Sequence, residues 1–283
     1  MAKVKVSLRS ICLYKNWQNS ITLGILDHFR SLHTFLIVKF FNIKSTKFTK
    51  EDAPMVSAII VAAGKGIRMN DKTRKQYLDL AGRPILAHSV IAFDACDLID
   101  KIFLVIPKED IEYCRNNIIP LLELKNGLDL IPGGEERQNS VYNALQAMDK
   151  KTDTVVVHDG VRPFIQLEKL ESCILGARKF GACILGIPAG DTIKCVGKSG
   201  FIKKTLSREN IWLAQTPQAF KYELIKKAHE TARHDGYTVS DDSLLVERLG
   251  IDVRIINGSK DNIKITVRED LVVARAILGS ITG

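Results

Sequence analysis

The sequence lacks the cysteine patterns that bind zinc or form a disulfide framework. Its six cysteines are Cys12, Cys96, Cys114, Cys173, Cys183 and Cys195. None of them forms a C-x-x-C pair, and no group of histidines lies near them. Metal sites and disulfide-rich folds depend on such spacings. We therefore expect reduced thiols, mostly buried, in a protein of a reducing compartment, the cytoplasm.

A long apolar run is missing as well. The longest candidate, Thr34 to Phe41, is shorter than a membrane-spanning helix requires and is interrupted by Lys39. The sequence therefore predicts no membrane span.

A basic face is also missing, although the whole chain has a net charge of +9. Residues 1–54 hold 9 Lys and Arg against 3 Asp and Glu, a net charge of +6. The rest of the chain holds 32 Lys and Arg against 29 Asp and Glu, a net charge of only +3. Proteins that bind nucleic acid concentrate basic residues on one surface. We therefore predict no nucleic-acid partner.

Residues 1–54 form an N-terminal extension with poor periodicity, few acidic residues and scattered Lys, Ser and Asn. Three interpretations stay open. In the first, the natural start is Met55. In the second, the segment is a transit peptide to a plastid-type organelle. In the third, the partly apolar and basic stretch from Leu23 to Phe41 anchors the protein to a membrane surface. We favour a dispensable, poorly ordered extension, followed by a single domain over 55–283.

From Met55 onward, short apolar runs alternate with amphipathic segments. The predicted strands are Val56–Val61, Ile102–Ile106, Leu128–Ile131, Thr154–His158, Ala182–Ile187 and Val253–Ile256. The predicted helices are Arg83–Ala95, Lys108–Asn117, Glu136–Met148, Leu167–Phe180, Lys221–His234, Asp241–Leu249 and Arg268–Leu278. This alternation predicts an α/β fold, a three-layer nucleotide-binding (Rossmann-like) domain with a mostly parallel central sheet. A polar segment at about 190–207, with a turn at Gly197–Gly200, predicts a projecting β-arm.

A glycine-rich loop, Ala62 to Met69, follows the first strand directly. It is not a Walker loop, because Ile67 follows its second glycine, and it is not a dinucleotide fingerprint, because Met69 stands at the third glycine position. By itself the loop fits an ordinary tight turn as well as a phosphate site. Three cations, Lys65, Arg68 and Lys75, favour the phosphate site, since they can neutralise charge on a transferring phosphoryl group.

Two further loops should lie at the same edge of the sheet, because the carboxyl ends of parallel strands meet there. After the third strand, Gly133 and Gly134 expose backbone groups that suit a base edge, with Glu135 and Ser140 nearby; a plain helix start is the alternative. After the fourth strand, Asp159 suits a metal ion or a substrate hydroxyl.

Three more segments complete the candidate site. Arg162 suits a phosphate. We interpret His158 as structural, because an ionised phosphate nucleophile needs no general base. Ser240-Asp241-Asp242 precedes a helix and is explained equally well as its N-cap. Lys264 is the one cation in an apolar alternating stretch.

Together these segments resemble the 2-C-methyl-D-erythritol 4-phosphate cytidylyltransferase family of the non-mevalonate isoprenoid pathway. The resemblance covers about residues 55–283. It is carried by Ala62-Ala63-Gly64-x-Gly66-x-Arg68-Met69, Lys75-Gln76-Tyr77, Gly82-x-Pro84, Gly133-Gly134-x-Glu136-Arg137-x-x-Ser140, His158-Asp159-x-x-Arg162-Pro163, Thr216-Pro217-Gln218 and Asn262-Ile263-Lys264. Two positions depart from the pattern, with Glu135 where Asp is usual and Ser240 where Thr is usual.

The resemblance implies a homodimer that transfers CMP from CTP to 2-C-methyl-D-erythritol 4-phosphate with a divalent cation, magnesium. The implied catalytic residues are Arg68, Lys75 and Lys264. The implied nucleotide-binding residues are Ala62, Ala63, Gly64, Gly66, Gly134, Glu135 and Ser140. The implied substrate-binding residues are Asp159, Arg162, Thr192, Lys194, Arg208, Thr216 and Ser240. Asp159 is also the implied metal ligand, and Thr192, Lys194 and Arg208 match arm positions that reach into the partner's site.

Other functions stay open at this point. A ribitol 5-phosphate cytidylyltransferase would share the scaffold and the chemistry. A sugar-phosphate nucleotidyltransferase using UTP or GTP fits the loop from Gly134 to Ser140 less well. A non-catalytic nucleotide-binding regulator is the alternative from another class, and the presence of every expected cation and of Asp159 argues against it.

Overall fold

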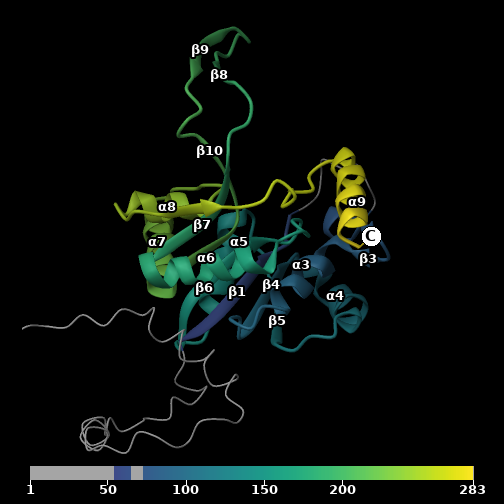
Figure 1. The fold of residues 1–283 in the computed structure, drawn as a ribbon. Coiled ribbons are helices and arrows are strands. Elements are labelled where there is room, and N and C mark those ends of the chain that lie inside the picture. The colour runs from purple at the N-terminus through teal and green to yellow at the C-terminus, as the bar shows by residue number, and fades with distance from the viewer. Residues whose placement is uncertain (1–53, 65–72, 283) are drawn as a thin grey trace, which may run out of the picture. The chain divides into compact units, whose positions relative to one another are not determined.

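A seven-stranded sheet forms the centre of the protein (Figure 1). The structure, a computed structural model, describes residues 54–64 and 73–282. The strands of this sheet are β1 (Met55–Val61), β4 (Lys101–Ile106), β5 (Gly127–Pro132), β6 (Thr152–Asp159), β7 (Ala182–Pro188), β10 (Trp212–Lys221) and β11 (Arg254–Asn257). Their order across the sheet is β11-β7-β10-β6-β1-β4-β5. Only β10 runs antiparallel to its neighbours within this sheet, so the predicted mostly parallel sheet is confirmed.

Helices cover both faces of the sheet, which confirms the three-layer architecture. Against one face pack α3 (Ile85–Asp94), α4 (Ile111–Asn117) and α6 (Leu167–Phe180). Against the other pack α5 (Arg137–Ala147), α7 (Tyr222–His234) and α8 (Asp242–Arg248). The strand β1 shows why its sequence is apolar throughout. Ala58 and Ile60 belong to the first core and Ile59 to the second, so both of its faces are buried.

A third, smaller core lies under the last helix, α9 (Arg268–Thr282). There Ala274 of α9 packs with Leu80, Val161 and Ile265. Leu80 belongs to β2 (Asp79–Leu80), which pairs with β3 (Arg83–Pro84) in a short hairpin. This core joins the C-terminal end of the chain to the segments that follow β1 and β6.

Several element boundaries differ from those predicted. The helix expected from Arg83 begins at Ile85, because Arg83 and Pro84 form β3. The helix expected from Lys108 is divided into the 3-10 helix η4 (Lys108–Asp110) and α4. Two further 3-10 turns, η3 (Lys75–Tyr77) and η5 (Ile119–Leu121), were not predicted, and neither was β10.

The predicted arm is a two-stranded antiparallel hairpin of β8 (Ile193–Val196) and β9 (Ile202–Leu206). Figure 1 shows it standing away from the central sheet, carried by the segments that continue β7 and β10. Gly200, in its turn, has a φ of 83°, a conformation that favours glycine. Within the described ranges, no helix is long and apolar enough to cross a bilayer.

Candidate active site

A cavity of about 510 Å³ lies where β1 and β6 end. Val61 ends β1, Asp159 ends β6, and Gly134 follows β5, and all three residues line the cavity. Ligands of parallel α/β sheets bind at this edge, as the sequence predicted. The predicted site residues that line the cavity are Ala62, Ala63, Gly64, Lys75, Gly134, Glu135, Ser140, Asp159 and Lys264.

The start of the glycine-rich loop is held by a buried glutamine. Nε2 of Gln76 donates a hydrogen bond of 2.8 Å to the carbonyl oxygen of Ala62, and its side chain is almost wholly buried. Gln76 belongs to η3, which also brings Lys75 to the cavity. In the sequence, Gln76 is marked only by its place in the motif Lys75-Gln76-Tyr77. Gly66 and Arg68, the other predicted residues of the loop, lie outside the described residues.

The loop after β5 packs tightly against its own helix. Oγ of Ser140 accepts a hydrogen bond of 3.1 Å from the backbone N–H of Gly134 and donates one of 3.1 Å to the carbonyl of Glu136. Glu136 and Asn139 form a capping box at the start of α5. Ser140 therefore shapes the loop that presents Gly134 and Glu135 to the cavity.

Three cations surround the carboxylate of Asp159 on one side of the cavity. Nε of Arg137 lies 3.1 Å from Oδ1 of Asp159, and Nζ of Lys264 lies 2.9 Å from Oδ2. Nε of Arg162 lies 3.5 Å from the same Oδ2. Burial by itself would raise the pKa of Asp159, but the charges of Arg137, Lys264 and Arg162 outweigh it and hold the pKa far below its usual value. The surrounding charges therefore favour the ionised form of Asp159.

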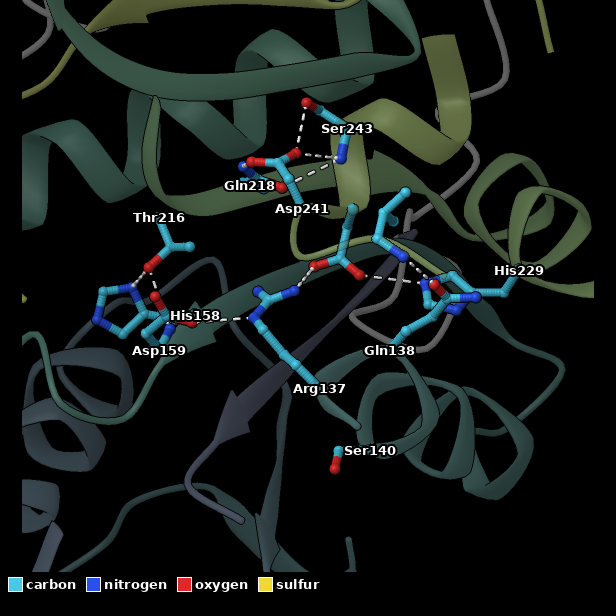
Figure 2. A network of polar contacts seen from close by, with 12 residues as sticks. Arg137, Gln138, Ser140, His158, Asp159, Thr216, Gln218, His229, Asp241 and Ser243 are labelled. Carbon is cyan, nitrogen blue, oxygen red and sulfur yellow. Dashed lines mark hydrogen bonds and ion pairs between the residues drawn. The ribbon is translucent and has the colours of Figure 1, made fainter. Parts of the chain in front are cut away.

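Arg137 makes a second ion pair on its other side. Its Nη1 lies 2.5 Å from Oδ2 of Asp242, at the start of α8 (Figure 2). Oδ1 of Asp242 lies 3.2 Å from Nε2 of His229 on α7. In the sequence, Arg137 is marked only by its place in a motif, and Asp242 is explained equally well as part of a helix start.

Comparisons with known proteins show which family the chain belongs to. The family model described as IspD, 2-C-methyl-D-erythritol 4-phosphate cytidylyltransferase, matches residues 56–280. The chain belongs to this family. A cytidylyltransferase of that name from Pelotomaculum thermopropionicum is 45% identical over 223 residues, which cover 79% of this chain and 94% of the relative. One from Caldanaerobacter subterraneus subsp. tengcongensis is 44% identical over 79% of this chain and 98% of the relative.

Solved structures of the same family share the fold. The 4-diphosphocytidyl-2C-methyl-D-erythritol synthase of Anaerococcus prevotii matches with a TM-score of 0.71 and 33% identity, over 80% of this chain and 96% of that one. The 2-C-methyl-D-erythritol 4-phosphate cytidylyltransferase of Francisella tularensis matches with a TM-score of 0.68 and 33% identity, over 79% and 99%. The protein is thus an enzyme, a cytidylyltransferase of the nucleotidyltransferase class.

Other residues predicted for the site of this cytidylyltransferase do not line the cavity. Thr216 is buried behind Asp159, and its Oγ1 accepts a hydrogen bond of 3.0 Å from the backbone N–H of Asp159. Arg162 is held inside as well, since its Nη1 donates a 2.7 Å hydrogen bond to the carbonyl of Asn262. Ser240 is exposed, one residue before Asp241, the N-cap of α8.

The three predicted arm residues are exposed and lie apart from the cavity lining. Nζ of Lys194 donates a 2.8 Å hydrogen bond to Oγ1 of Thr205 across the hairpin. Arg208 donates to the carbonyl of Gly190 at the base of the arm. Thr192 stands just before β8. Their roles in binding stay predictions.

Two glutamines that were not predicted fix the segment around Ser240. Nε2 of Gln138 donates to the carbonyl of Tyr237 at 3.0 Å, and its Oε1 accepts from the N–H of Val239 at 2.9 Å. Nε2 of Gln218 donates to Oδ2 of Asp241 at 2.8 Å. Ser240 is therefore bracketed by anchored residues on both sides. Gln218 stood out in the sequence only as part of the motif Thr216-Pro217-Gln218, and Gln138 was marked by no motif, since glutamine is common on protein surfaces.

Within the described part of the chain, no three His, Cys, Asp or Glu side chains gather as a metal site. Magnesium in nucleotide enzymes does not need such a group, because phosphate oxygens and water fill most of its ligand positions beside one or two carboxylates. Asp159 is a carboxylate that lines the cavity, and its two oxygens are paired with Arg137, Lys264 and Arg162.

Proposed function

We propose that this cavity transfers CMP from CTP to 2-C-methyl-D-erythritol 4-phosphate, yielding 4-diphosphocytidyl-2-C-methyl-D-erythritol and pyrophosphate for isoprenoid precursor synthesis. The observation that carries the proposal is the arrangement of charge around one cavity. Lys75 and Lys264 line it from separate elements, and the glycine loops after β1 and β5 bring backbone groups to it. Small residues at a strand end suit phosphate oxygens, and cations on both sides suit two anionic substrates.

The reaction that fits this arrangement is an in-line displacement. A phosphate oxygen of the acceptor attacks the α-phosphorus of CTP, a new P–O bond forms, and the bond to the β-phosphate oxygen breaks as pyrophosphate leaves. The acceptor oxygen is already ionised, so the protein need not remove a proton. Its task is to align two anions and to neutralise charge.

The nucleotide and the acceptor occupy different parts of the cavity in this proposal. Gly134, Glu135 and Ser140 contact cytosine and ribose, and Ala62 to Gly64 with Lys75 contact the triphosphate. Lys264 and Asp159 contact the acceptor, with Arg162, Thr216 and Ser240 around them. Arg68, outside the described residues, keeps its proposed catalytic role.

A divalent cation, magnesium, completes the proposed chemistry. When bound, it would supply positive charge that offsets the charge of the phosphates. Asp159 is the carboxylate that we propose to hold it. Chelation with EDTA should abolish turnover, and added magnesium should restore it.

We also propose that the enzyme is a homodimer in which the arm reaches the partner's cavity. Thr192, Lys194 and Arg208 lie on the arm, exposed and apart from the cavity of their own chain. Side chains so placed can serve a second copy. The cytoplasmic location inferred from the thiols also stays a prediction, to be tested by cell fractionation.

Pyrophosphate release with CTP and magnesium tests the function. Three reactions are compared, with methylerythritol phosphate, with ribitol 5-phosphate and with no acceptor. We expect release only with methylerythritol phosphate, and little when UTP replaces CTP. Release only with ribitol 5-phosphate would move the function to that acceptor. Binding of CTP without release in any reaction would indicate a regulator.

A further inference from the structure

Arg137 joins three elements of the fold, α5, β6 and α8, through two ion pairs. It is the first residue of α5, directly after the loop that we assign to the base. Its guanidinium pairs with Asp159 at the end of β6 and with Asp242 at the start of α8. Arg137 lines the cavity, yet only 21% of its side chain is exposed. A planar guanidinium with two bound carboxylates has one orientation, so Arg137 fixes the distance between these elements.

The ion pair between Arg137 and Asp242 is supported by His229, which contacts the other oxygen of Asp242. Figure 2 shows the chain of contacts running from Asp159 through Arg137 and a carboxylate to His229. Asp242 and His229 are almost wholly buried, with side-chain exposures of 2% and 0%. Burial by itself would raise the pKa of Asp242, but the charge of Arg137 and the hydrogen bond from His229 outweigh it and lower the pKa. An ionised carboxylate only accepts hydrogen bonds, so Nε2 of His229 is the donor.

The ion pair between Arg137 and Asp159 affects Lys264, because Lys264 also binds Asp159. Of the three cations on Asp159, Lys264 is the most exposed, at 40%, against 21% for Arg137 and 12% for Arg162. Lys264 is also a flexible point charge, whereas the guanidinium of Arg137 is fixed on both sides. An incoming phosphate therefore competes for Lys264 first. Arg137 keeps Oδ1 of Asp159 in place while that exchange occurs.

We propose that Arg137 is a positioning residue, anchored by Asp242 and His229, that holds Asp159 so that Lys264 can turn from Asp159 to the acceptor phosphate. This inference rests on the proposed assignment of the cavity to CTP and methylerythritol phosphate. It adds residues from α5, α7 and α8 to that site. None of them needs to touch the reacting atoms to act in this way.

The first test separates positioning from nucleotide binding. In the full-length protein, Arg137→Gln should lower kcat/KM for methylerythritol phosphate by about 100-fold, the loss expected when a reacting group is misplaced by about 1 Å. The KM for CTP should change by no more than about threefold. Arg137→Lys should recover part of the loss, because it restores the charge without the second contact. The matched control is Arg248→Gln, which removes an arginine–aspartate pair with Asp235 outside the cavity.

The second test asks whether Asp242 acts through Arg137. Asp242→Asn alone should lower kcat/KM for the acceptor by about tenfold, but it should cause no further loss in the Arg137→Gln background. If Arg137 and Asp242 had independent structural roles, their losses of kcat/KM would add, and each loss would be matched by a loss of melting temperature. Additive losses, or a KM for CTP raised as much as that for the acceptor, would overturn the proposal. If Arg137→Gln does not fold, the same cycle is measured with Arg137→Lys.

The reaction of the wild-type protein, measured alongside the variants, distinguishes the proposed function from the proposed role of Arg137. A wild-type protein that releases no pyrophosphate with CTP and methylerythritol phosphate contradicts the proposed function. An active wild-type protein whose Arg137→Gln variant is folded and equally active contradicts only the role of Arg137.

Discussion

The hydroxyl of Thr216 and Nδ1 of His158 are 3.0 Å apart and joined by a hydrogen bond in the interior of the protein. On the other side of the ring, Nε2 lies 3.0 Å from the carbonyl oxygen of Arg162, which can only accept. Burial lowers the pKa of His158 and keeps the ring neutral, so its proton lies on Nε2 and Thr216 donates to Nδ1. This relationship gives His158 a structural place in the fold, and it uses the only proton of the Thr216 hydroxyl.

The first prediction concerns stability at low pH. Burial lowers the pKa of His158 to about 4, from the ordinary 6.5. The unfolded chain therefore takes up this proton between pH 6.5 and 4, while the folded protein does not. Stability falls as the pH falls through that window, and His158 contributes about 3 kcal/mol to the loss of unfolding free energy. Urea unfolding at several pH values measures it.

His158→Gln isolates this contribution. The variant should be less stable at pH 7, yet it should lose about 3 kcal/mol less than the wild type between pH 6.5 and 4. His234→Gln, which removes an exposed histidine, is the control and should leave the wild-type slope intact. Equal slopes in the wild type and in His158→Gln would contradict the neutral, buried ring.

The second prediction concerns Lys75. Its position in the cavity beside the glycine-rich loop leads us to expect that Lys75→Ala lowers kcat by about 100-fold to 1,000-fold, the loss typical of removing one group that stabilises transition-state charge. The circular dichroism spectrum should not change. Lys169→Ala, on the outer part of α6, serves as the control. A folded Lys75→Ala variant with near-normal turnover would remove Lys75 from the mechanism.

The third prediction tests the arm by subunit complementation. Lys75→Ala and Arg208→Ala should each be inactive alone. If Arg208 serves the partner's cavity, a mixed dimer of the two variants contains one site with both residues intact, so mixing after partial unfolding and refolding should restore activity. Arg208 serving its own chain would leave every site defective. Differently tagged chains show whether mixed dimers form. If mixed dimers form and activity does not recover, Arg208 acts in the site of its own chain.

The sequence predicted the strands that contain an apolar run, and it missed β10, in which polar side chains are buried. Ile102–Ile106 is an unbroken apolar run and appears as β4. In β10, Gln215 and Gln218 flank Thr216 and Pro217, which no apolar or alternating pattern would include. Those polar side chains are buried because they bond to Ser259, Asp241 and Asp159 from elements far apart in the sequence.

The residues of the candidate site also divide into those that a local sequence pattern marks and those that only the fold brings together. Glycines and cations after a strand end predicted the cavity lining, because a local pattern places them at the edge of the sheet. The pair of Arg137 and Asp242 spans 105 residues, and Asp242 has an adequate local explanation beside a helix N-cap. Long-range ion pairs depend on packing between layers, which a single sequence does not show.

The last prediction contrasts Gly64, which lines the cavity, with Gly133, which lies in the loop after β5. A Cβ on Gly133 would lie 2.3 Å from Cβ of Ala63, so Gly133→Ala must push the loops after β5 and β1 apart. Overpacking of this kind costs about 1–3 kcal/mol. A Cβ on Gly64 meets no atom of the described residues within 4 Å, and Gly64→Ala should change the unfolding free energy by no more than about 0.5 kcal/mol.

For nucleotide binding, Gly64→Ala should have a larger effect than Gly133→Ala, the reverse of their effects on stability. We place the triphosphate at Gly64, where an added Cβ would meet no atom of the described residues, so Gly64→Ala should raise the KM for CTP by about tenfold or more, as expected when a hydrogen bond to a charged phosphate is lost. Urea unfolding and the pyrophosphate assay measure the two effects on the same preparations. A Gly64→Ala variant with normal KM for CTP would show that the triphosphate does not approach the loop at this residue, and would move the nucleotide toward Lys75 and the loop after β5.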